Sequence, residues 1–233
     1  MLNNITPMVK SIILLNIAMY VCTVLIAPQT YDLFALYLFE SPKFHIWQVF
    51  SHMFMHSNTG FTHILFNMYG LFLFGPALEQ WMGSNKFLFF YLASGLGAYL
   101  LTTGIDYYQY IGFVGQLEAE GATTTQIQEI LFPQAGMTKV SQAMVGASGC
   151  LFGVMAGFAY LYPNVKFQLL FVPYPIAAKW LIGAYMAYET LSVLGVLSLQ
   201  DNVGHAAHVG GAIVGFIMVW YWKRNDMDQF RIN

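Results

Sequence analysis

Long apolar runs alternate with short polar or Pro/Gly-containing segments along most of the chain. A helix needs about 20 mostly apolar residues to cross the ~30 Å hydrocarbon core of a bilayer. The runs predict six membrane-spanning helices, near residues 8–27, 62–80, 86–104, 145–162, 177–199 and 204–222. We interpret the first run as a transmembrane helix rather than a signal peptide, because it is long and no small-residue cleavage motif follows it.

One segment, residues 106–142, interrupts this pattern. It is acidic, and its stretch TTTQIQEILF is typical of a short amphipathic helix. We therefore expect a single all-α membrane domain over residues 1–233, a six-helix bundle in which residues 106–142 form an outer insertion.

Composition supports a lipid environment for this bundle. The chain is 58% hydrophobic and only 9% charged, whereas an ordinary soluble domain carries about 25% charged residues. The net charge of −2 gives no indication of nucleic-acid binding. The two cysteines, Cys22 and Cys150, lie in apolar runs and are interpreted as small buried hydrophobic residues, not as a disulfide or metal site.

The basic residues predict the orientation. If the N-terminus is cytoplasmic, only Lys43 and Lys139 of the 9 basic residues fall on the outer side. This asymmetry is what the positive-inside rule expects, so both termini are predicted to be cytoplasmic.

Strongly polar residues inside predicted spans are costly and mark candidate functional positions. His63 and Asn67 are four apart near the start of the second span, so they share one helical face. As two hydrogen-bond donors on one face, they could stabilise a developing negative charge. The alternative is that they form hydrogen bonds to neighbouring helices and have a purely structural role.

The motif GASG opens the fourth span and contains Ser148. Taken alone, Ser148 at a helix start is most often a cap. The small residues of this span, Gly149, Gly153 and Gly157, recur every four residues and allow another backbone to approach closely.

The start of the sixth span repeats this pattern. Gly204, His208, Gly211 and Gly215 form one stripe at spacings of four, three and four. A lone histidine on an apolar face is usually structural, but His208 shares its face with residues that permit close contact. The predicted topology also brings the polar residues of spans two, four and six to similar depth in the outer half of the bilayer. A hydroxyl beside a histidine is the arrangement of an activated nucleophile, so these residues form a candidate catalytic site.

Together these motifs resemble those of the rhomboid family of intramembrane serine proteases, from about Trp47 to Tyr221. HxxxN occurs as His63 and Asn67, GxSG as GASG, and AHxxGxxxG as AHVGGAIVG. The run GPALEQWMGSNKFLFFYLASG is similar to the family's ExxxGSxxFxxxYxxSG. The Trp-Arg pair familiar in the family's first outer loop is absent, and that loop is instead aromatic, with His52 and His56 interpreted as structural or interfacial.

The resemblance implies a role for each matching residue. Ser148 would be the nucleophile, and His208 the general base and then the general acid. His63, Asn67 and the Ser148 backbone N–H would hold the oxyanion, and Glu79 with Gly83 would anchor the turn between spans two and three. Structural or packing positions are Gly146, Gly149, Gly153, Gly157, Gly204, Gly211 and Gly215.

Two points about the histidine stay open. The family uses a dyad without an acid, and Asp201 and Glu189 are candidates for an orienting partner. His205 is a rival base, although it lies off the glycine stripe and does not match AHxxG.

The resemblance implies an endopeptidase that cleaves transmembrane segments of single-span or multi-span membrane proteins through an acyl-enzyme, with no cofactor and no metal. We expect an integral protein of the cell (inner) membrane whose site faces the non-cytoplasmic side and whose insertion shapes access or selects substrates. One alternative is a catalytically inactive rhomboid-like factor that binds membrane proteins; such factors usually lack the serine or the histidine. Another is a small transporter, and this interpretation predicts charged residues within the spans or broken helices near the midplane of the bilayer.

Overall fold

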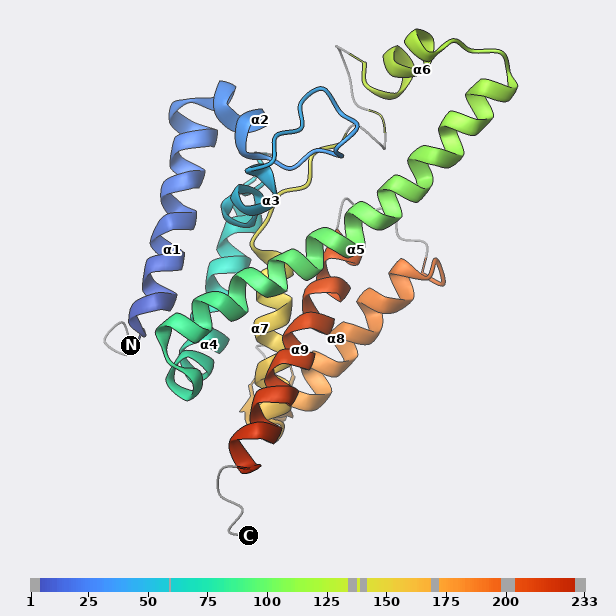
Figure 1. Cartoon of the computed structure of the whole chain (residues 1–233). Helices are drawn as coiled ribbons and strands as arrows, with labels where there is room; N and C mark the ends of the chain where they lie inside the picture. Colours follow the sequence, from blue (N-terminus) through green and yellow to red (C-terminus); the bar gives the residue numbers. More distant parts are fainter. Residues whose placement is uncertain are drawn as a thin grey trace.

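A computed structural model of the chain describes residues 5–58, 60–133, 138, 142–168, 172–197 and 204–228. Within these residues each of the six predicted spans contains a helix, and the protein is an all-α membrane protein of the expected class (Figure 1). The long helices are α1 Pro7–Tyr20 with a π-helical continuation Val21–Ile26, α4 Thr62–Met82, α5 Ser84–Ala119, α7 Ser148–Leu161, α8 Ala178–Val193 and α9 His205–Asp228.

Among the described residues, two segments are long and apolar enough to cross a membrane, Pro7–Ile26 and Ser84–Ala119. Helix α7 is strongly apolar but has only 14 residues. The six-span topology and the orientation of the termini therefore remain predictions.

Helix α5 continues well past the end of the predicted third span. Its 36 residues correspond to about 54 Å, which exceeds the ~30 Å of a bilayer core. The first part of the predicted insertion, from Asp106 to Ala119, is therefore helix, and α5 reaches beyond the rest of the bundle (Figure 1). Gly121, with φ 84°, follows the end of the helix.

The amphipathic helix predicted within the insertion is confirmed as α6, Thr124–Leu131. The Thr123 side chain accepts a hydrogen bond from the Gln126 backbone N–H, and the Gln126 side chain accepts one from the Thr123 backbone N–H. This reciprocal capping box satisfies two N–H groups at the helix start. Ile127 and Leu131 form the buried face of α6.

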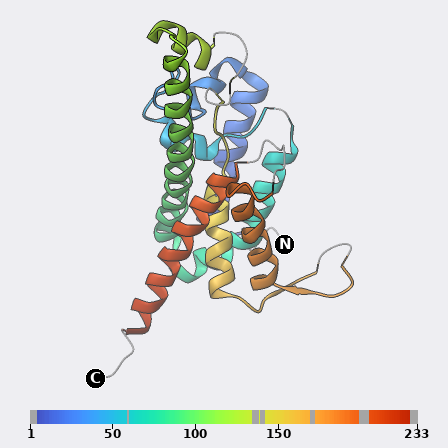
Figure 2. The ribbon, with the colours of Figure 1, turned by 90° about the vertical axis from the view of Figure 1, so that its right-hand side faces the viewer.

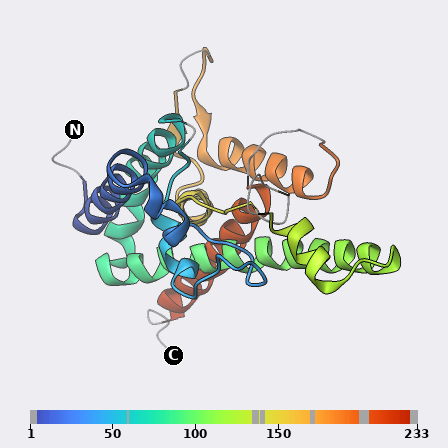
Figure 3. The same ribbon diagram turned by 90° about the horizontal axis from the view of Figure 1, so that it is seen from above.

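Helix α7 lies at the centre of the bundle, with α4, α5, α8 and α9 around it (Figure 3). Most of its buried side chains belong to the main hydrophobic core, to which α1, α4 and α5 also contribute. Large apolar side chains remain exposed around the outside, for example Phe66, Phe89 and Leu100. An exposed apolar surface on this scale is what contact with lipid requires.

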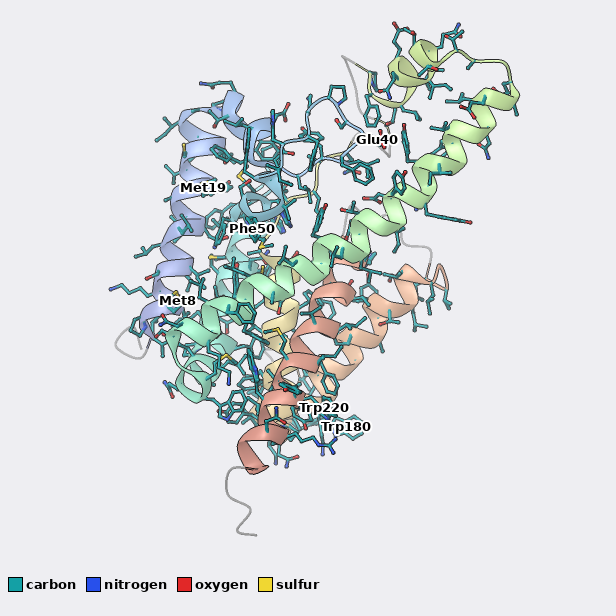
Figure 4. All side chains as sticks on the ribbon, viewed as in Figure 1. Met8, Met19, Glu40, Phe50, Trp180 and Trp220 are labelled. Carbon is teal, nitrogen blue, oxygen red and sulfur yellow. The ribbon has the colours of Figure 1, made fainter. Side chains whose placement is uncertain are left out.

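The loop between α1 and α4, which the predicted topology places on the outer side and which we call the outer loop, folds into short helices, and a small β-ribbon connects α7 to α8. The loop holds a 3₁₀ turn Pro28–Thr30, α2 Tyr31–Phe34, α3 Gln48–Ser51 and a second 3₁₀ turn His52–Phe54. The ribbon pairs β1, Lys166–Phe167, with β2, Ile176–Ala177, in antiparallel register and projects from the bundle (Figure 2). Trp180 and Trp220, both exposed, lie at the end of the bundle opposite Glu40 (Figure 4).

Candidate active site

The turn that leads into α7 is held by the outer loop. Leu36 and Met144 form an antiparallel bridge with N···O distances of 3.0 and 2.8 Å. The Gly146 N–H donates to the His52 carbonyl at 3.0 Å. Gly146 has φ 137°, a backbone conformation that side-chain-bearing residues rarely adopt. The loop and this glycine thus set where α7 begins.

Ser148 is the first residue of α7 and is half-buried. The residue at the cap position is Ala147, and no side chain caps the helix. The interpretation of Ser148 as a helix cap is therefore wrong. The N–H groups of the first helical turn have no partner within the helix and carry the positive end of its dipole, so a negative charge beside Ser148 is favoured there.

His63 faces this turn from α4. A Cβ placed on Gly146 would meet His63 Nε2 at 3.3 Å and Ser148 Oγ at 3.3 Å, so the imidazole and the hydroxyl flank the same glycine. His63 Nδ1 accepts a hydrogen bond from the Ser57 N–H at 3.2 Å. In the neutral ring the proton consequently sits on Nε2, the nitrogen that faces Gly146 and Ser148. His63 is placed to donate a hydrogen bond into the site.

Asn67 lies one turn farther along α4 and is buried. Its Nδ2 donates to the His63 carbonyl at 2.8 Å, and its Oδ1 has no hydrogen-bond partner among the described residues. The predicted pair thus lies on one face as expected. One amide hydrogen of Asn67 is used within α4, and the second has no acceptor among the described residues.

Helices α7 and α9 touch through backbone at the predicted glycines. A Cβ on Gly211 would collide with the Gly149 carbonyl group, and one on Gly215 would meet the Gly153 backbone at 2.5 Å. Gly157 continues the contact, since a Cβ there would meet Val219 at 2.9 Å and Phe90 at 3.2 Å.

Gly204 does not share this packing. It is exposed, lies just before α9, and a Cβ there would meet only Ala207 Cβ, at 3.7 Å. Its carbonyl accepts the His208 N–H at 3.2 Å. Gly97 and Gly210, which the sequence analysis did not single out, make a further close backbone contact between α5 and α9.

His208 is buried and stacks on Phe152, with ring centroids 3.9 Å apart and an interplanar angle of 3°. Phe152 follows Ser148 by four residues, and residues four apart lie on one helical face. His208 therefore packs against the face of α7 that carries Ser148. Among the described residues no hydrogen bond joins Ser148 Oγ to His208; such bonds are often long until substrate is bound.

Only one of the two candidate acids lies among the described residues. Asp201 lies outside the described residues, whereas Glu189 on α8 is completely buried. A carboxylate oxygen of Glu189, Oε2, lies 2.6 Å from His205 Nδ1 and 3.1 Å from His208 Nδ1. His205, the rival base, is therefore engaged by Glu189. The sequence signal for Glu189 was an acid within a predicted span, which is costly unless it is paired.

Ligand atoms of Glu189, His205 and His208 lie within 4.8 Å of one another, a grouping that the sequence analysis did not expect. Two ligands of one tetrahedral zinc ion, each about 2.0–2.1 Å from the metal, are about 3.3 Å apart. The 2.6 Å between His205 Nδ1 and Glu189 Oε2 is shorter than this and is a hydrogen-bond distance. The cluster fits a shared proton better than a shared metal ion.

Glu79 and Gly83 secure the end of α4. Glu79 Oε1 accepts the Met8 N–H at 2.9 Å and the Ser84 hydroxyl at 2.6 Å, and its Oε2 accepts the Val9 N–H at 2.8 Å. Gly83 has φ 82°, the left-handed region that favours glycine, and its N–H donates to the Glu79 carbonyl at 2.7 Å. The pair ties the turn between α4 and α5 to the start of α1.

His52 and His56 have structural contacts, in keeping with their interpretation. His52 Nδ1 pairs with the Gln48 carbonyl at 2.8 Å, and His56 Nε2 pairs with Asn16 Oδ1 at 2.8 Å. Burial lowers the pKa of His52 to about 4, and burial, aided by the neighbouring His63, lowers the pKa of His56 to about 3. Both rings are neutral near pH 7.

Comparison with known proteins assigns most of the chain to one family. Residues 43–225 match the family model described as Rhomboid domain. The chain is 28% identical over 218 residues to Rhomboid protease AarA of Providencia stuartii, covering 89% of this chain and 69% of that protein. It is 24% identical over 179 residues to Rhomboid protease GlpG of Haemophilus influenzae, covering 77% of this chain and 71% of that protein.

A mitochondrial relative has a longer chain. Rhomboid protein 1 of Saccharomyces cerevisiae is 27% identical over 165 residues, which cover 71% of this chain but 39% of that protein. The family model spans residues 43–225, which are most of the present chain and contain His63, Asn67, Ser148 and His208. This protein therefore belongs to the rhomboid family.

Proposed function

We propose that this protein is an intramembrane serine endopeptidase in which Ser148 is the nucleophile and His208 the general base. The observation that carries the proposal is the stacking of His208 on Phe152, on the face of α7 that also bears Ser148. Relatives named as rhomboid proteases support a protease function at the level of the family.

The mechanism follows from these positions. His208 Nε2 takes the proton of the Ser148 hydroxyl as Oγ attacks the scissile carbonyl carbon, and the carbonyl oxygen becomes an oxyanion. His208 then gives the proton to the leaving amine, which departs as the acyl-enzyme forms. A water molecule, activated by His208 in the same way, attacks the acyl carbon and releases Ser148.

The oxyanion has donors on two sides. His63 Nε2 and the N–H groups at the start of α7 are close to Gly146, and Asn67 retains one amide hydrogen. Loss of a single preorganised donor of this kind costs about 10²–10³-fold in kcat. The positive end of the α7 dipole adds to the stabilisation of negative charge.

The substrates we infer are transmembrane segments of single-span or multi-span membrane proteins. A helix in lipid has all its backbone groups bonded internally, so the scissile bond is reachable only after local unwinding. Segments with glycine, proline or other small residues near the outer surface should therefore be preferred. With both termini cytoplasmic, the site opens to the non-cytoplasmic side of the cell (inner) membrane.

The test is cleavage of a reporter with one helix-destabilised transmembrane segment by purified protein in liposomes, together with labelling by a serine-reactive fluorophosphonate. We expect cleavage and labelling by the wild type and neither by Ser148→Ala or His208→Ala. Ser192→Ala on α8 and His45→Ala in the outer loop are matched controls and should retain both. A folded wild type that neither cleaves nor labels would refute the protease function and favour a membrane-protein binding factor.

A further inference from the structure

Glu189 is a buried carboxylate on a helix that we expect to lie in the membrane, and two histidines of α9 lie beside it. None of its surface is exposed. Its Oε2 lies 2.6 Å from His205 Nδ1 and 3.1 Å from His208 Nδ1. Burial of an unpaired carboxylate is strongly unfavourable, so a glutamate at this position needs these partners.

Two polar atoms of this cluster are left without hydrogen bonds. Within the described part of the chain, Glu189 Oε1 and His208 Nδ1 are both buried and have no hydrogen-bond partner. Buried polar atoms are almost always paired. His208 Nδ1 lies only 3.1 Å from Oε2, so a small change in the orientation of the ring or of the carboxylate would complete a hydrogen bond between His208 and Glu189.

We propose that Glu189 is a positioning residue for His208, so that the site works as a Ser148–His208–Glu189 triad with His205 as the second anchor of the carboxylate. This inference rests on the function proposed above. It departs from the dyad that the sequence resemblance implied, since it adds an acid. That acid lies on α8 and is remote from His208 in sequence, so the sequence around His208 does not reveal it.

The geometry of the ring assigns a task to each nitrogen. Nδ1 lies 3.1 Å from Glu189 Oε2. With the hydrogen bond between them formed, Nδ1 carries the proton, and the lone pair of Nε2 is left to take the proton of the Ser148 hydroxyl. When Nε2 is protonated, the ring is a cation, and the Glu189 carboxylate stabilises it until the proton passes to the leaving amine. Glu189 keeps its charge throughout, as the acid of a serine-protease triad does.

His205 holds the carboxylate from the other side. Its short contact to Oε2 restricts Glu189 to the space between α8 and α9. Its ring also packs edge-on against Tyr188 of α8, with centroids 5.8 Å apart. Removal of His205 should therefore loosen Glu189 without removing the charge beside His208.

The experiment compares Glu189→Gln, Glu189→Ala and Glu189→Asp with the wild type, using kcat and KM on the liposome reporter, the rate of fluorophosphonate labelling and the unfolding temperature. Rates are normalised to the folded fraction from size-exclusion chromatography. Glu79→Gln is the matched control, because Glu79 is also a buried carboxylate but bonds only to Ser84 and the start of α1 among the contacts described above.

Glu189→Gln and Glu189→Ala should lower kcat and the labelling rate about 10- to 100-fold with KM unchanged, the range for loss of a hydrogen bond to a charged group. Glu189→Asp, which keeps the charge, should recover part of the rate. His205→Ala should lose less than Glu189→Gln. Glu79→Gln should lower the unfolding temperature and leave kcat unchanged.

Equal kcat in the wild type and Glu189→Gln, or a Glu189→Gln protein that loses only stability as Glu79→Gln does, would overturn the positioning role and leave the protease function intact. If the folded wild type neither labels nor cleaves, the protease function fails and the triad fails with it. The two failures are therefore distinguishable.

Discussion

Gly211→Ala tests whether the close contact of α7 and α9 sets the geometry of the site. A Cβ on Gly211 would lie 2.7 Å from the Gly149 carbonyl carbon and 3.2 Å from its Cα. Favourable carbon–carbon contacts are about 3.5–4.0 Å, so the helices must separate by roughly 1 Å. Gly149 directly follows Ser148, and the separation would therefore move the serine away from His208.

The expected effect on stability is the difference of two terms. Overpacking costs about 1–3 kcal/mol, and replacement of a helical glycine by alanine returns up to about 1 kcal/mol. We expect Gly211→Ala to lower the free energy of unfolding by about 1–2 kcal/mol. We expect a larger effect on the rate, because a misplacement of about 1 Å at a catalytic group can cost about 10²-fold.

The assay is denaturant unfolding in detergent micelles, with fluorophosphonate labelling of the folded protein. Gly183→Ala is the control: Gly183 lies in α8, is exposed, and a Cβ there meets nothing within 4 Å. That variant should be at least as stable as the wild type and label at the same rate. A Gly211→Ala protein that behaves like Gly183→Ala would refute the dependence of the site on this backbone contact.

Four further outcomes are expected. Glu79→Gln should destabilise the protein by about 1–2 kcal/mol in the same unfolding assay, because it weakens charge-assisted bonds at the start of α1. His63→Ala should lower kcat about 10²–10³-fold with little change in KM, and an unchanged kcat would exclude it as an oxyanion donor. Burial lowers the pKa of His56 to about 3, so below about pH 6.5 the unfolded chain binds a proton on this ring that the folded chain does not. As the pH falls from about 6.5 to about 3, His56 should lower the free energy of unfolding by at most about 1.4 kcal/mol per pH unit, in addition to the contribution of His52, so His56→Gln should lose stability less steeply than the wild type. Deletion of α6 should change the relative cleavage of a panel of transmembrane reporters, and unchanged rates would show that the insertion does not select substrates.

The apolar pattern located the helices well because hydropathy is a local property of the chain. It did not predict that the helix of the third span continues to Ala119, and the reason is physical. Hydropathy falls near Asp106, but a helix ends where its backbone is interrupted, and α5 has no proline between Ser84 and Ala119. The signal for its end was Gly121, whose positive φ follows the last turn.

The environment of His208 was less predictable, because it depends on how α8 and α9 pack. Asp201 is closer to His208 along the chain, but sequence distance says little about side-chain distance across two helices. Glu189 reaches both histidines because α8 lies beside α9. The one sequence signal was its position within a predicted span, where an acid requires a partner.

Packing and chemistry are not alternative explanations for the small residues around Ser148. Gly149 and Gly211 bring α7 and α9 into backbone contact, and that contact lets the His208 ring stack on Phe152 beside the serine. Gly146 adopts a conformation that a larger residue would avoid and leaves room for His63. In a membrane, where apolar side chains gain little by leaving lipid, close backbone packing is a main source of helix association. The residues that hold the bundle together are therefore also those that position the serine, the two histidines and the carboxylate of the proposed site.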